Sequence, residues 1–481
     1  MDKYFLIGIK GTGMASLALY LKARGCSVSG WDRPEVFYTD EHLAASGISF
    51  STEDDCPIDQ DAKVIWSTAY KASSCSILKR ALESRECFSY PQLLAALSQQ
   101  GQTYAVAGTH GKTTSVAACS WIFSSGPRAS FPIGSIFGSF LQGQGALCHG
   151  TENLILEACE YQDHFLAYKL RGALVTSIDF DHPDFFESLE DVMQSFKRFA
   201  QGLGFLVYCA DDDNARKLGQ YARKLGIMSI GYGFSARGPF HVTQAQDSSI
   251  ALDLIPYMSF RLPFASKALL NDLVGSAILS AMLLLDRPQP KLYLQEGSLV
   301  SDEALATEIA DMLKTLETYP GCTGRCETLL VEKGVTYIDD YAHHPSEIKV
   351  SLSNIRALHP GCRLVVAFKS HTASRTRAFL EDFASSLSLA DRLVISPVYS
   401  SARQDGSHGE DEKLARELCD LITRRYLYSY TSKLESCVYA SDSQAAAVLA
   451  SALEEGCVCV TLGAANNRGL CRQAALLRRD R

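Results

Sequence analysis

Short apolar runs typical of strands alternate with longer amphipathic runs typical of helices along almost the whole 481-residue chain. The first section, for example, contains "YFLIGI", "MASLALYLKAR", "CSVSGWD" and "AKVIWSTA" in that order. Such strand–helix–strand units place parallel strands in one sheet that helices cover. The chain is too long for one domain, because single cores stop growing at about 250–300 residues. The pattern therefore predicts several α/β domains with mostly parallel sheets.

Two changes in this pattern divide the chain into three predicted domains. The alternation restarts at "TYAVAGTHGKTT", and "LETYPGCTGRCETLL" has the Pro and Gly of a linker. We expect a Rossmann-like N-terminal domain at 1–100, a P-loop-type ATPase domain with a parallel sheet at 101–318, and a Rossmann-like C-terminal domain at 319–481. Short alternating runs between about 229 and 263 predict an antiparallel edge, and the apolar run at 268–286 predicts a buried core helix.

Composition limits the partners and the compartment. A formal net charge of -8 argues against a nucleic-acid-binding surface, which needs clustered Lys and Arg. The sixteen cysteines are scattered without a C-x-x-C pair, and the alternation around Cys457 and Cys459 predicts buried thiols on a strand. The N-terminus lacks the pattern of a secretory signal. We expect a cytoplasmic monomer or weak homodimer without a nucleic-acid or membrane partner.

The first glycine loop contains Gly8, Gly11 and Gly13 and lies between a predicted strand and a predicted helix. Loops of this geometry bind pyrophosphate. The G-x-G-x-x-G fingerprint of dinucleotide enzymes is incomplete, since Ser16 stands where the third glycine belongs, although Asp32 closes the second strand where a ribose-binding acid is usual. A nicotinamide cofactor, another nucleotide diphosphate and a plain turn all remain open.

The second glycine loop carries a G-K-T core between a predicted strand and a predicted helix. In such loops backbone amides hold phosphates, while Lys112 neutralises the terminal phosphates and the Thr113 hydroxyl reaches Mg²⁺. The strict motif would need glycine at Val106, so this loop is a shortened relative. We expect an ATP-type site, with a structural turn as the alternative, at Gly108, Thr109, His110, Gly111, Lys112, Thr113 and Thr114.

Two more strand ends supply candidate metal ligands. Glu157 lies in "LILEACEYQDHF" and His182 lies in "VTSIDFDHPDFF". The carboxyl ends of parallel strands meet at one edge of a sheet, so we expect both side chains at the edge that holds the phosphate loop. Mg²⁺ needs oxygen ligands besides phosphate and water. These residues are therefore candidates to complete a magnesium site with Thr113.

The segments "GTHGKTT", "EACEYQDHF", "TSIDFDHPD" and "DDYAHHPSE" resemble, in this order, the Mur ligases of peptidoglycan synthesis. The opening "IGIKGTGMASLA" is similar to the UDP-binding start of that family, and "FKSHTASRTRAFLEDF" is similar to its C-terminal substrate motif. The resemblance covers all three predicted domains. It is closest to the members that attach L-alanine to UDP-N-acetylmuramic acid.

The resemblance implies an ATP- and Mg²⁺-dependent amide ligase of cell wall biogenesis, which serves cell shape and cell division. ATP would phosphorylate the muramoyl carboxylate, and the amino group of L-alanine would displace phosphate from the acyl phosphate. Because the reactants are anionic, such a site must supply cations and oriented N–H groups. A histidine is the candidate to take the proton of the incoming amine.

The resemblance also implies roles for individual residues. Lys112 would bind the β and γ phosphates, Thr113 and Glu157 would hold one Mg²⁺, and Glu157 and His182 would share a second. The remaining implied contacts are adenine at Asn271, the ATP ribose at Asp340, a phosphate at Arg325, the UDP group at Gly11, Thr12, Gly13, Ser67, Thr68 and Ala69, and the muramoyl carboxylate and alanine at His343, His344, His371 and Arg375.

Several positions depart from the family pattern or need a decision. Leu270 stands where the family has a histidine, and Ala465 and Asn466 stand where the family has Gly and Asp. Gly324 and Thr372 stand where the family has basic residues, which leaves the amino-acid selectivity open. Some sibling ligases carry a carbamoylated lysine between two metals. Lys197 lies on the helix after His182, but we expect it to be an ordinary surface or packing residue.

Three other functions remain as alternatives. The nearest is a recycling ligase that joins a preformed tripeptide to the same UDP sugar and shares the three domains. A nicotinamide-dependent dehydrogenase would use the loop at Gly8, and a non-catalytic ATP-binding protein would use only the loop at Lys112.

Overall fold

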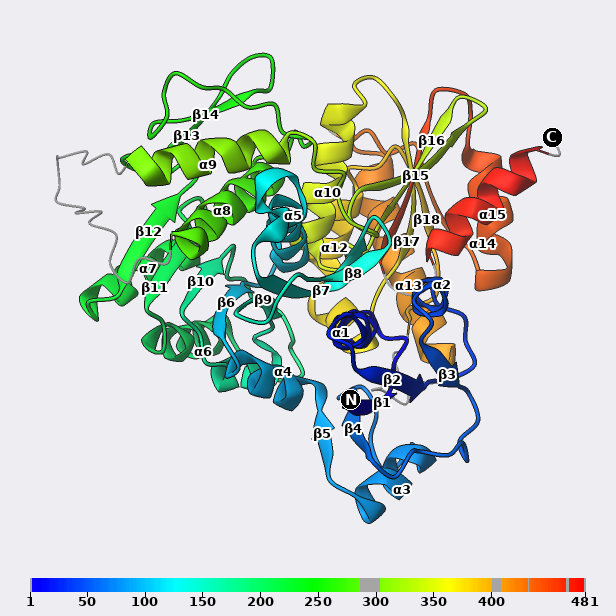
Figure 1. Cartoon of the computed structure of the whole chain (residues 1–481). Helices are drawn as coiled ribbons and strands as arrows, with labels where there is room; N and C mark the ends of the chain where they lie inside the picture. The colour runs from blue at the N-terminus through cyan, green and yellow to red at the C-terminus, as the bar shows by residue number, and fades with distance from the viewer. Residues whose placement is uncertain (1, 286–302, 400–407, 431, 464–466, 480–481) are drawn as a thin grey trace. The chain divides into compact units, whose positions relative to one another are not determined.

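The computed structural model describes residues 2–285, 303–399, 408–430, 432–463 and 467–479. The chain forms two compact units, and each is considered by itself below. The first unit consists of Met1–Phe180, Phe185–Pro263 and Lys267–Cys322, and the second consists of Asp181–Asp184, Phe264–Ser266 and Thr323–Arg481. The first unit contains two large sheets and the second contains one (Figure 1).

The N-terminal sheet of the first unit is fully parallel and has the strand order β3-β2-β1-β4-β5. Its strands are β1 (Lys3–Ile7), β2 (Ser27–Trp31), β3 (Ser49–Ser51), β4 (Ala62–Trp66) and β5 (Cys87–Ser89). Its helices are α1 (Thr12–Ala23), α2 (Thr39–Ala45), α3 (Ser76–Ser84) and α4 (Tyr90–Ser98). Since β1 and β4 are neighbours, the loops after both strands lie at the same carboxyl edge.

The second sheet of the first unit has seven strands in the order β12-β11-β10-β6-β9-β7-β8. Its strands are β6 (Gln102–Ala107), β7 (Ile133–Leu141), β8 (Gln144–Cys148), β9 (Asn153–Ala158), β10 (Gly172–Val175), β11 (Phe205–Cys209) and β12 (Met228–Tyr232). Every neighbouring pair is parallel except β7 with β8. The sheet order brings the ends of β6, β9 and β10 together, which is where the phosphate loop and Glu157 are predicted to meet.

Helices cover this sheet and include the predicted core helix. They are α5 (Lys112–Ser124), η1 (Gly126–Ser130), η2 (Tyr161–Ala167), α6 (Leu189–Gln201), α7 (Asp213–Lys224), α8 (Lys267–Leu284) and α9 (Glu303–Leu316). Within the described residues, α8 is the one helix long and apolar enough to cross a membrane, and most of it is buried inside the protein. The prediction of a buried core helix at 268–286 is therefore confirmed over its described part.

The expected antiparallel edge at 229–263 is wrong in part. Strand β12 is parallel to β11, and the antiparallel pair β13 (Val242–Gln244) and β14 (Ile250–Leu252) forms a separate two-stranded sheet. The antiparallel edge of the large sheet is instead β8. The sequence pattern missed the β7–β8 hairpin because β7 is buried along most of its length and so lacks the alternation of a half-buried strand.

The sheet of the second unit has six strands in the order β15-β16-β20-β17-β18-β19, and only β15 is antiparallel to its neighbour. The strands are β15 (Glu327–Glu332), β16 (Val335–Asp340), β17 (Leu364–Lys369), β18 (Arg392–Ile395), β19 (Ser436–Tyr439) and β20 (Val458–Gly463). The helices are α10 (Pro345–Leu358), α11 (Ala373–Ala378), α12 (Leu380–Leu387), α13 (His408–Ile422), η3 (Thr423–Leu427), α14 (Asp442–Ala452) and α15 (Asn467–Arg479).

The three large sheets confirm the predicted α/β fold with mostly parallel strands. Each sheet takes all its strands from one of the three predicted domains, although the boundaries at 100 and 318 remain predictions. None of the sixteen cysteines, all of which lie in described segments, forms a disulfide. Cys457 and Cys459 are buried beside and on β20, as the alternation predicts.

Candidate active site

The phosphate loop runs from the end of β6 to the start of α5, as predicted. Gly111 is the N-cap of α5 with φ +84°, a left-handed conformation that favours glycine, and a Cβ there would lie 2.4 Å from Asp272 Oδ1. Because glycine has no side chain, nothing of its own bonds the first amides of α5. The first turn of this fully described helix also has no acidic residue. The geometry is that of an anion site at a helix N-terminus.

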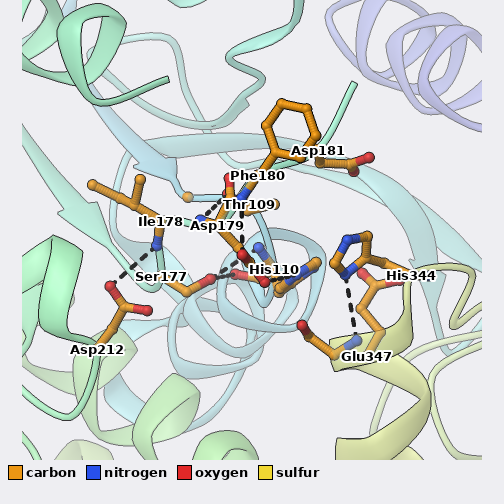
Figure 2. A network of polar contacts seen from close by, with 12 residues as sticks. Thr109, His110, Ser177, Ile178, Asp179, Phe180, Asp181, Asp212, His344 and Glu347 are labelled. Carbon is orange, nitrogen blue, oxygen red and sulfur yellow. Dashed lines mark hydrogen bonds and ion pairs between the residues drawn. The ribbon is translucent and has the colours of Figure 1, made fainter. Parts of the chain in front are cut away.

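The segment after β10 supports this loop (Figure 2). The Thr109 hydroxyl accepts the Asp179 N–H at 2.8 Å, and the His110 N–H donates to Ser177 Oγ at 3.0 Å. Thr176 donates its hydroxyl to the His110 carbonyl. Sequence reasoning missed Thr176, Ser177 and Asp179, although all three lie in or beside the quoted "TSIDFDHPD". These bonds fix the loop backbone before any phosphate arrives.

The Lys112 amine lies across the same loop. It donates to the carbonyls of Gly108 and Thr109, the latter at 2.9 Å, and forms an ion pair with Glu160 at 3.3 Å. The Glu160 side chain is only 2% exposed. Sequence reasoning also missed Glu160, and its signal was a second glutamate three residues after Glu157. The pair holds the Lys112 charge at the mouth of the loop.

Glu157 has one occupied and one unused carboxylate oxygen. Oε2 accepts the Gly138 N–H at 2.7 Å, whereas Oε1 is buried and has no hydrogen-bond partner among the described residues. A Cβ on Gly138 would lie 3.0 Å from Glu157 Oε2 and 3.9 Å from Thr113 Oγ1. The carboxylate and the hydroxyl thus border the same small space. Two oxygen donors, one of them buried and unsatisfied, fit a divalent cation.

Asn271 on α8 has a similar unsatisfied atom. Its Nδ2 donates to Asp211 Oδ2 at 2.6 Å, and that bond fixes the orientation of the amide. Its Oδ1 is buried and accepts no hydrogen bond from the described part of the chain. A buried acceptor without a donor fits the exocyclic amino group of adenine. The predicted adenine contact is therefore chemically consistent with the local structure.

The predicted UDP-binding residues lie at the carboxyl edge of the N-terminal sheet. Gly11 is the N-cap of α1, and Thr12 and Gly13 begin the helix. After β4, the Ser67 N–H donates to the Ile7 carbonyl at 2.9 Å. The turn continues through Thr68 and Ala69, whose N–H donates to Ser67 Oγ at 3.3 Å.

The Asp32 carboxylate accepts its hydrogen bonds from groups of the N-terminal domain itself. It is 4% exposed, and its carboxylate accepts from the N–H groups of Lys10 and Arg33, at 2.7 and 2.8 Å, and from the Tyr70 hydroxyl at 2.5 Å. Burial raises the pKa of Asp32. Hydrogen bonds from its own domain thus occupy both oxygens of the Asp32 carboxylate.

In the second unit, Arg375 is buried against Asp181. Arg375 Nε donates to Asp181 Oδ1 at 3.0 Å and Nη2 donates to Oδ2 at 3.2 Å, which is a bidentate pair. Burial alone would raise the pKa of Asp181, but His182 and Arg375 outweigh it and hold this pKa well below its usual range. Sequence reasoning missed Asp181. His182 itself has a left-handed φ of +56°, a conformation often found at functional sites.

The paired histidines at the start of α10 have different environments. His343 Nδ1 lies 3.0 Å from the Tyr341 carbonyl and 3.3 Å from Glu347 Oε2, and burial lowers its pKa to about 4. His344 is the N-cap of α10, where Nδ1 accepts the Ser346 N–H at 3.3 Å. At neutral pH His343 is therefore uncharged, and His344 has a structural function at the helix terminus.

The other predicted C-terminal residues surround this histidine pair. His371 Nδ1 lies 3.2 Å from Arg375 Nη1, and its ring lies 5.8 Å from that of His343. Arg325 approaches Glu347 at 4.0 Å. The Asp340 carboxylate accepts from Ala342 N–H at 2.8 Å, Ser351 hydroxyl at 2.8 Å and Cys326 N–H at 3.1 Å.

The departures at Thr372 and Gly324 have local structural functions, whereas Ala465 and Asn466 lie outside the described residues. Thr372 is the N-cap of α11, and its hydroxyl accepts the Arg375 N–H at 3.4 Å. Gly324 donates its N–H to Glu327 Oε2 at 2.8 Å. Lys197 forms an ion pair with Glu190 at 3.5 Å, as an ordinary surface lysine does.

The structure thus groups the predicted residues in two sets. Lys112, Thr113, Glu157 and Asn271 belong to the first unit, whereas His182 and the residues around Arg375 belong to the second. Their convergence on one substrate remains a prediction.

Relatives of known name match nearly the whole chain. It is 32% identical over 479 residues to a UDP-N-acetylmuramate–L-alanine ligase of Treponema pallidum, covering 97% of this chain and 94% of the relative. It is 31% identical over 419 residues to the enzyme of the same name from Borreliella burgdorferi, covering 84% and 86%.

Solved structures share the fold at lower identity. A UDP-N-acetylmuramate–alanine ligase of Thermotoga maritima superposes with a TM-score of 0.74 at 20% identity and 100% coverage of both chains. A murein peptide ligase of Psychrobacter arcticus gives 0.67 at 18% identity, covering 99% of this chain and 98% of its own.

Family models cover each of the three sheets in turn. The Mur ligase family catalytic domain matches residues 3–102, the Mur ligase middle domain matches 106–269, and the Mur ligase glutamate ligase domain matches 324–465. Taken with the full-length relatives, the phosphate loop and the carboxylate beside it, these matches show that the chain belongs to the Mur ligase family.

Proposed function

We propose that this protein joins L-alanine to the carboxylate of UDP-N-acetylmuramic acid with ATP, releasing ADP and phosphate, in the cytoplasmic stage of peptidoglycan synthesis. The observation that carries the proposal is the Glu157 carboxylate, which presents beside the phosphate loop a buried oxygen that has no hydrogen-bond partner in the described part of the chain. The relatives from Treponema pallidum and Borreliella burgdorferi, both named for this reaction, support the choice of substrates.

The first unit would bind ATP. The amides of the loop from Gly108 to Thr114 would hold the phosphates, and Lys112 would exchange its loop carbonyls for the β and γ phosphates. Thr113 and Glu157 would hold Mg²⁺, and Asn271 would accept from adenine. When bound, Mg²⁺ would neutralise the charge that accumulates as phosphate moves to the carboxylate. We assign His182 to a second cation shared with Glu157.

The second unit would bind the reacting carboxylate and the amino acid. His343 is neutral at pH 7, because its pKa is about 4. Its Nδ1–H can donate to the Tyr341 carbonyl, which leaves the lone pair on Nε2. We assign to Nε2 a hydrogen bond from the incoming amine. His371 and Arg375 would face the muramoyl carboxylate and the alanine. Arg325 would contact a phosphate, and Asp340 would contact the ATP ribose.

The N-terminal edge would bind the UDP group. The amides of Gly11, Thr12 and Gly13 would hold the diphosphate at the start of α1, and the turn at Ser67, Thr68 and Ala69 would close over it. We propose domain boundaries at 100 and 318 and a monomer or weak homodimer. Analytical ultracentrifugation of the full chain tests the oligomeric state.

A phosphate-release assay tests the reaction. Purified protein is supplied with ATP, Mg²⁺ and UDP-N-acetylmuramic acid, and then with L-alanine, L-serine, glycine or the tripeptide L-alanyl-γ-D-glutamyl-diaminopimelate. We expect the highest kcat/KM with L-alanine. Faster turnover with the tripeptide would assign the recycling reaction instead. If no acceptor leads to phosphate release, a non-catalytic ATP-binding protein is favoured. Tight, saturable NADH binding would instead support a nicotinamide-dependent dehydrogenase.

A further inference from the structure

Ser16 on α1 occupies the position of the missing third glycine, and the proposed function gives it no part. Its side chain is completely buried and points from α1 to the β7–β8 hairpin, which packs beside α1 (Figure 1). Ser16 Oγ donates to the Gly145 carbonyl on β8 and accepts the Phe137 N–H on β7 at 3.3 Å. One hydroxyl thus links the UDP-binding helix to both strands of the hairpin.

The Ser16 hydrogen bonds occur at the point where β7 stops pairing with β9. Strand β7 pairs with β9 up to Ile136, which lies opposite Leu156, so the ladder ends one residue before Glu157. The pairing of β7 with β8 shifts register immediately afterwards. Beyond the ladder, the Phe137 N–H bonds Ser16 and the next amide, that of Gly138, bonds Glu157 Oε2 at 2.7 Å. Two successive amides therefore connect Ser16 with the proposed metal ligand.

We propose that Ser16 is a positioning residue for the Glu157 carboxylate. By holding the Phe137 amide, Ser16 fixes the Ile136–Phe137 peptide and thereby the direction of the next peptide, whose Gly138 N–H points at Oε2. Oε1 is then left facing the cation space. The inference rests on the proposed function, in which Glu157 binds Mg²⁺. Groups behind a metal ligand orient it and strengthen metal binding in this way.

Simple packing is the competing explanation, and Ser120 provides a matched control. Ser120 lies on α5, is 3% exposed, and its hydroxyl lies 2.7 Å from Ser135 Oγ on the same strand β7. At this helix–β7 contact, Ser120→Ala therefore removes a buried hydroxyl whose hydrogen bonds within the described residues go to Val116 and Ser135 and not to Phe137 or Gly138.

The test is a titration of the full chain with Mn²⁺ in the presence of a non-hydrolysable ATP analogue. Electron paramagnetic resonance measures the bound and free Mn²⁺. We expect Ser16→Ala to raise the Mn²⁺ dissociation constant about tenfold, with Ser120→Ala within about twofold of the wild type. In turnover assays Ser16→Ala should raise the Mg²⁺ concentration for half-maximal rate and leave the KM for the UDP sugar unchanged. Gly138→Ala should weaken Mn²⁺ binding as well, because its Cβ would lie 3.0 Å from Glu157 Oε2.

Other results would contradict either the positioning role of Ser16 or the metal site itself. Wild-type Mn²⁺ affinity in folded Ser16→Ala, or equal losses in Ser16→Ala and Ser120→Ala, overturns the positioning role. If Ser16→Ala does not fold, Ser16→Cys replaces it, since a thiol is only moderately larger than the hydroxyl, forms a weaker hydrogen bond and should give an intermediate affinity. Glu157→Gln is the benchmark: unchanged Mn²⁺ binding in that variant would overturn the metal site itself and the inference with it.

Discussion

Two charged side chains of the candidate site each form an ion pair with a buried, oppositely charged residue. Arg375 pairs with Asp181 in two hydrogen bonds, and Lys112 pairs with Glu160. Such pairs contribute little net stability, but removing one partner is costly because a buried charge is left alone. Variants of the candidate site therefore need a measure of folding beside every measure of activity.

Lys112→Ala should abolish turnover and also destabilise the first unit by about 3 kcal/mol, since Glu160 loses its cation. The double variant Lys112→Ala/Glu160→Gln should recover most of that stability and remain inactive. Urea unfolding and ADP release measure the two effects separately. Turnover in the double variant would contradict the phosphate-binding role of Lys112, and a wild-type unfolding curve for Lys112→Ala would contradict the ion pair.

Asp339 should make the protein less stable as pH rises. Burial raises its pKa to about 6, and Thr461 donates a hydroxyl to it at 2.7 Å. Between about pH 4 and 6 the folded protein keeps a proton that the unfolded chain has lost, so its stability falls by about 2 kcal/mol across this window. Asp339→Asn should remove that loss, because the amide oxygen can still accept from Thr461.

Unfolding free energies at pH 4, 6 and 8 test this prediction. The exposed Asp382→Asn is the control, which should keep the wild-type pH dependence. An Asp339→Asn variant that is no more stable than the wild type at pH 8 would refute the assignment.

At the level of elements, the N-termini of two pairs of helices differ. Helices α1 and α5 begin at glycine N-caps and have no acidic residue in the first turn over their described length. In contrast, α6 and α7 have the side-chain caps Ser188 and Asp212 and acidic first turns. Side-chain caps and acids compensate the positive end of a helix, and an anionic ligand does the same. Helices α1 and α5 are the two that we propose to bind phosphates, and α3, which is described in full, also begins without a side-chain cap or an acidic first turn.

The N-cap of α10 gives a prediction at this scale. His344→Ala should cost about 1 kcal/mol from lost capping, plus the loss of ring packing against Phe379, whose centroid lies 4.7 Å away. His344→Asn retains a capping acceptor and should cost less. Urea unfolding measures both. Equal destabilisation would contradict the capping role, and an inactive but stable His344→Asn would assign the imidazole a direct contact with substrate.

At the level of the whole first unit, the β7–β8 hairpin joins the two large sheets. Its Phe140 ring stacks on His42 of α2 at 4.1 Å, and Gly134 allows Tyr20 of α1 to lie directly on β7. A contact between a glycine and a rigid ring tolerates little change, because protein interiors are close-packed.

Gly134→Ala should therefore destabilise the protein by about 1–3 kcal/mol, since overpacking forces side chains and backbone apart. Its Cβ would lie 2.6 Å from Tyr20 Cε2. The control is Gly409→Ala on α13, where a Cβ would meet no atom of the described residues within 4 Å. That substitution should be neutral or stabilising, because alanine favours helix. Thermal unfolding of both variants measures the difference. Equal melting temperatures would contradict the close contact between Gly134 and Tyr20.

Much of the candidate site was predictable from local patterns. The strand–loop–helix around Lys112, the strand end at Glu157 and the helix at Asn271 each depend on residues close together in the sequence. The partners of these residues were not predictable. Asp181 and Arg375 are hydrogen-bonded although they are 194 positions apart in the sequence, and Ser16 and Phe137 are hydrogen-bonded although they are 121 positions apart.

The sequence by itself determined the α/β class, the two glycine loops and the family, because hydrophobic periodicity and loop chemistry act over a few residues. Only the tertiary structure decided that Asp32 bonds its own loop, that Glu160 pairs with Lys112 and that one oxygen of Glu157 has no hydrogen bond among the described residues. Those outcomes depend on which distant groups meet in a water-poor interior, where each polar atom must find a partner or remain available for a ligand.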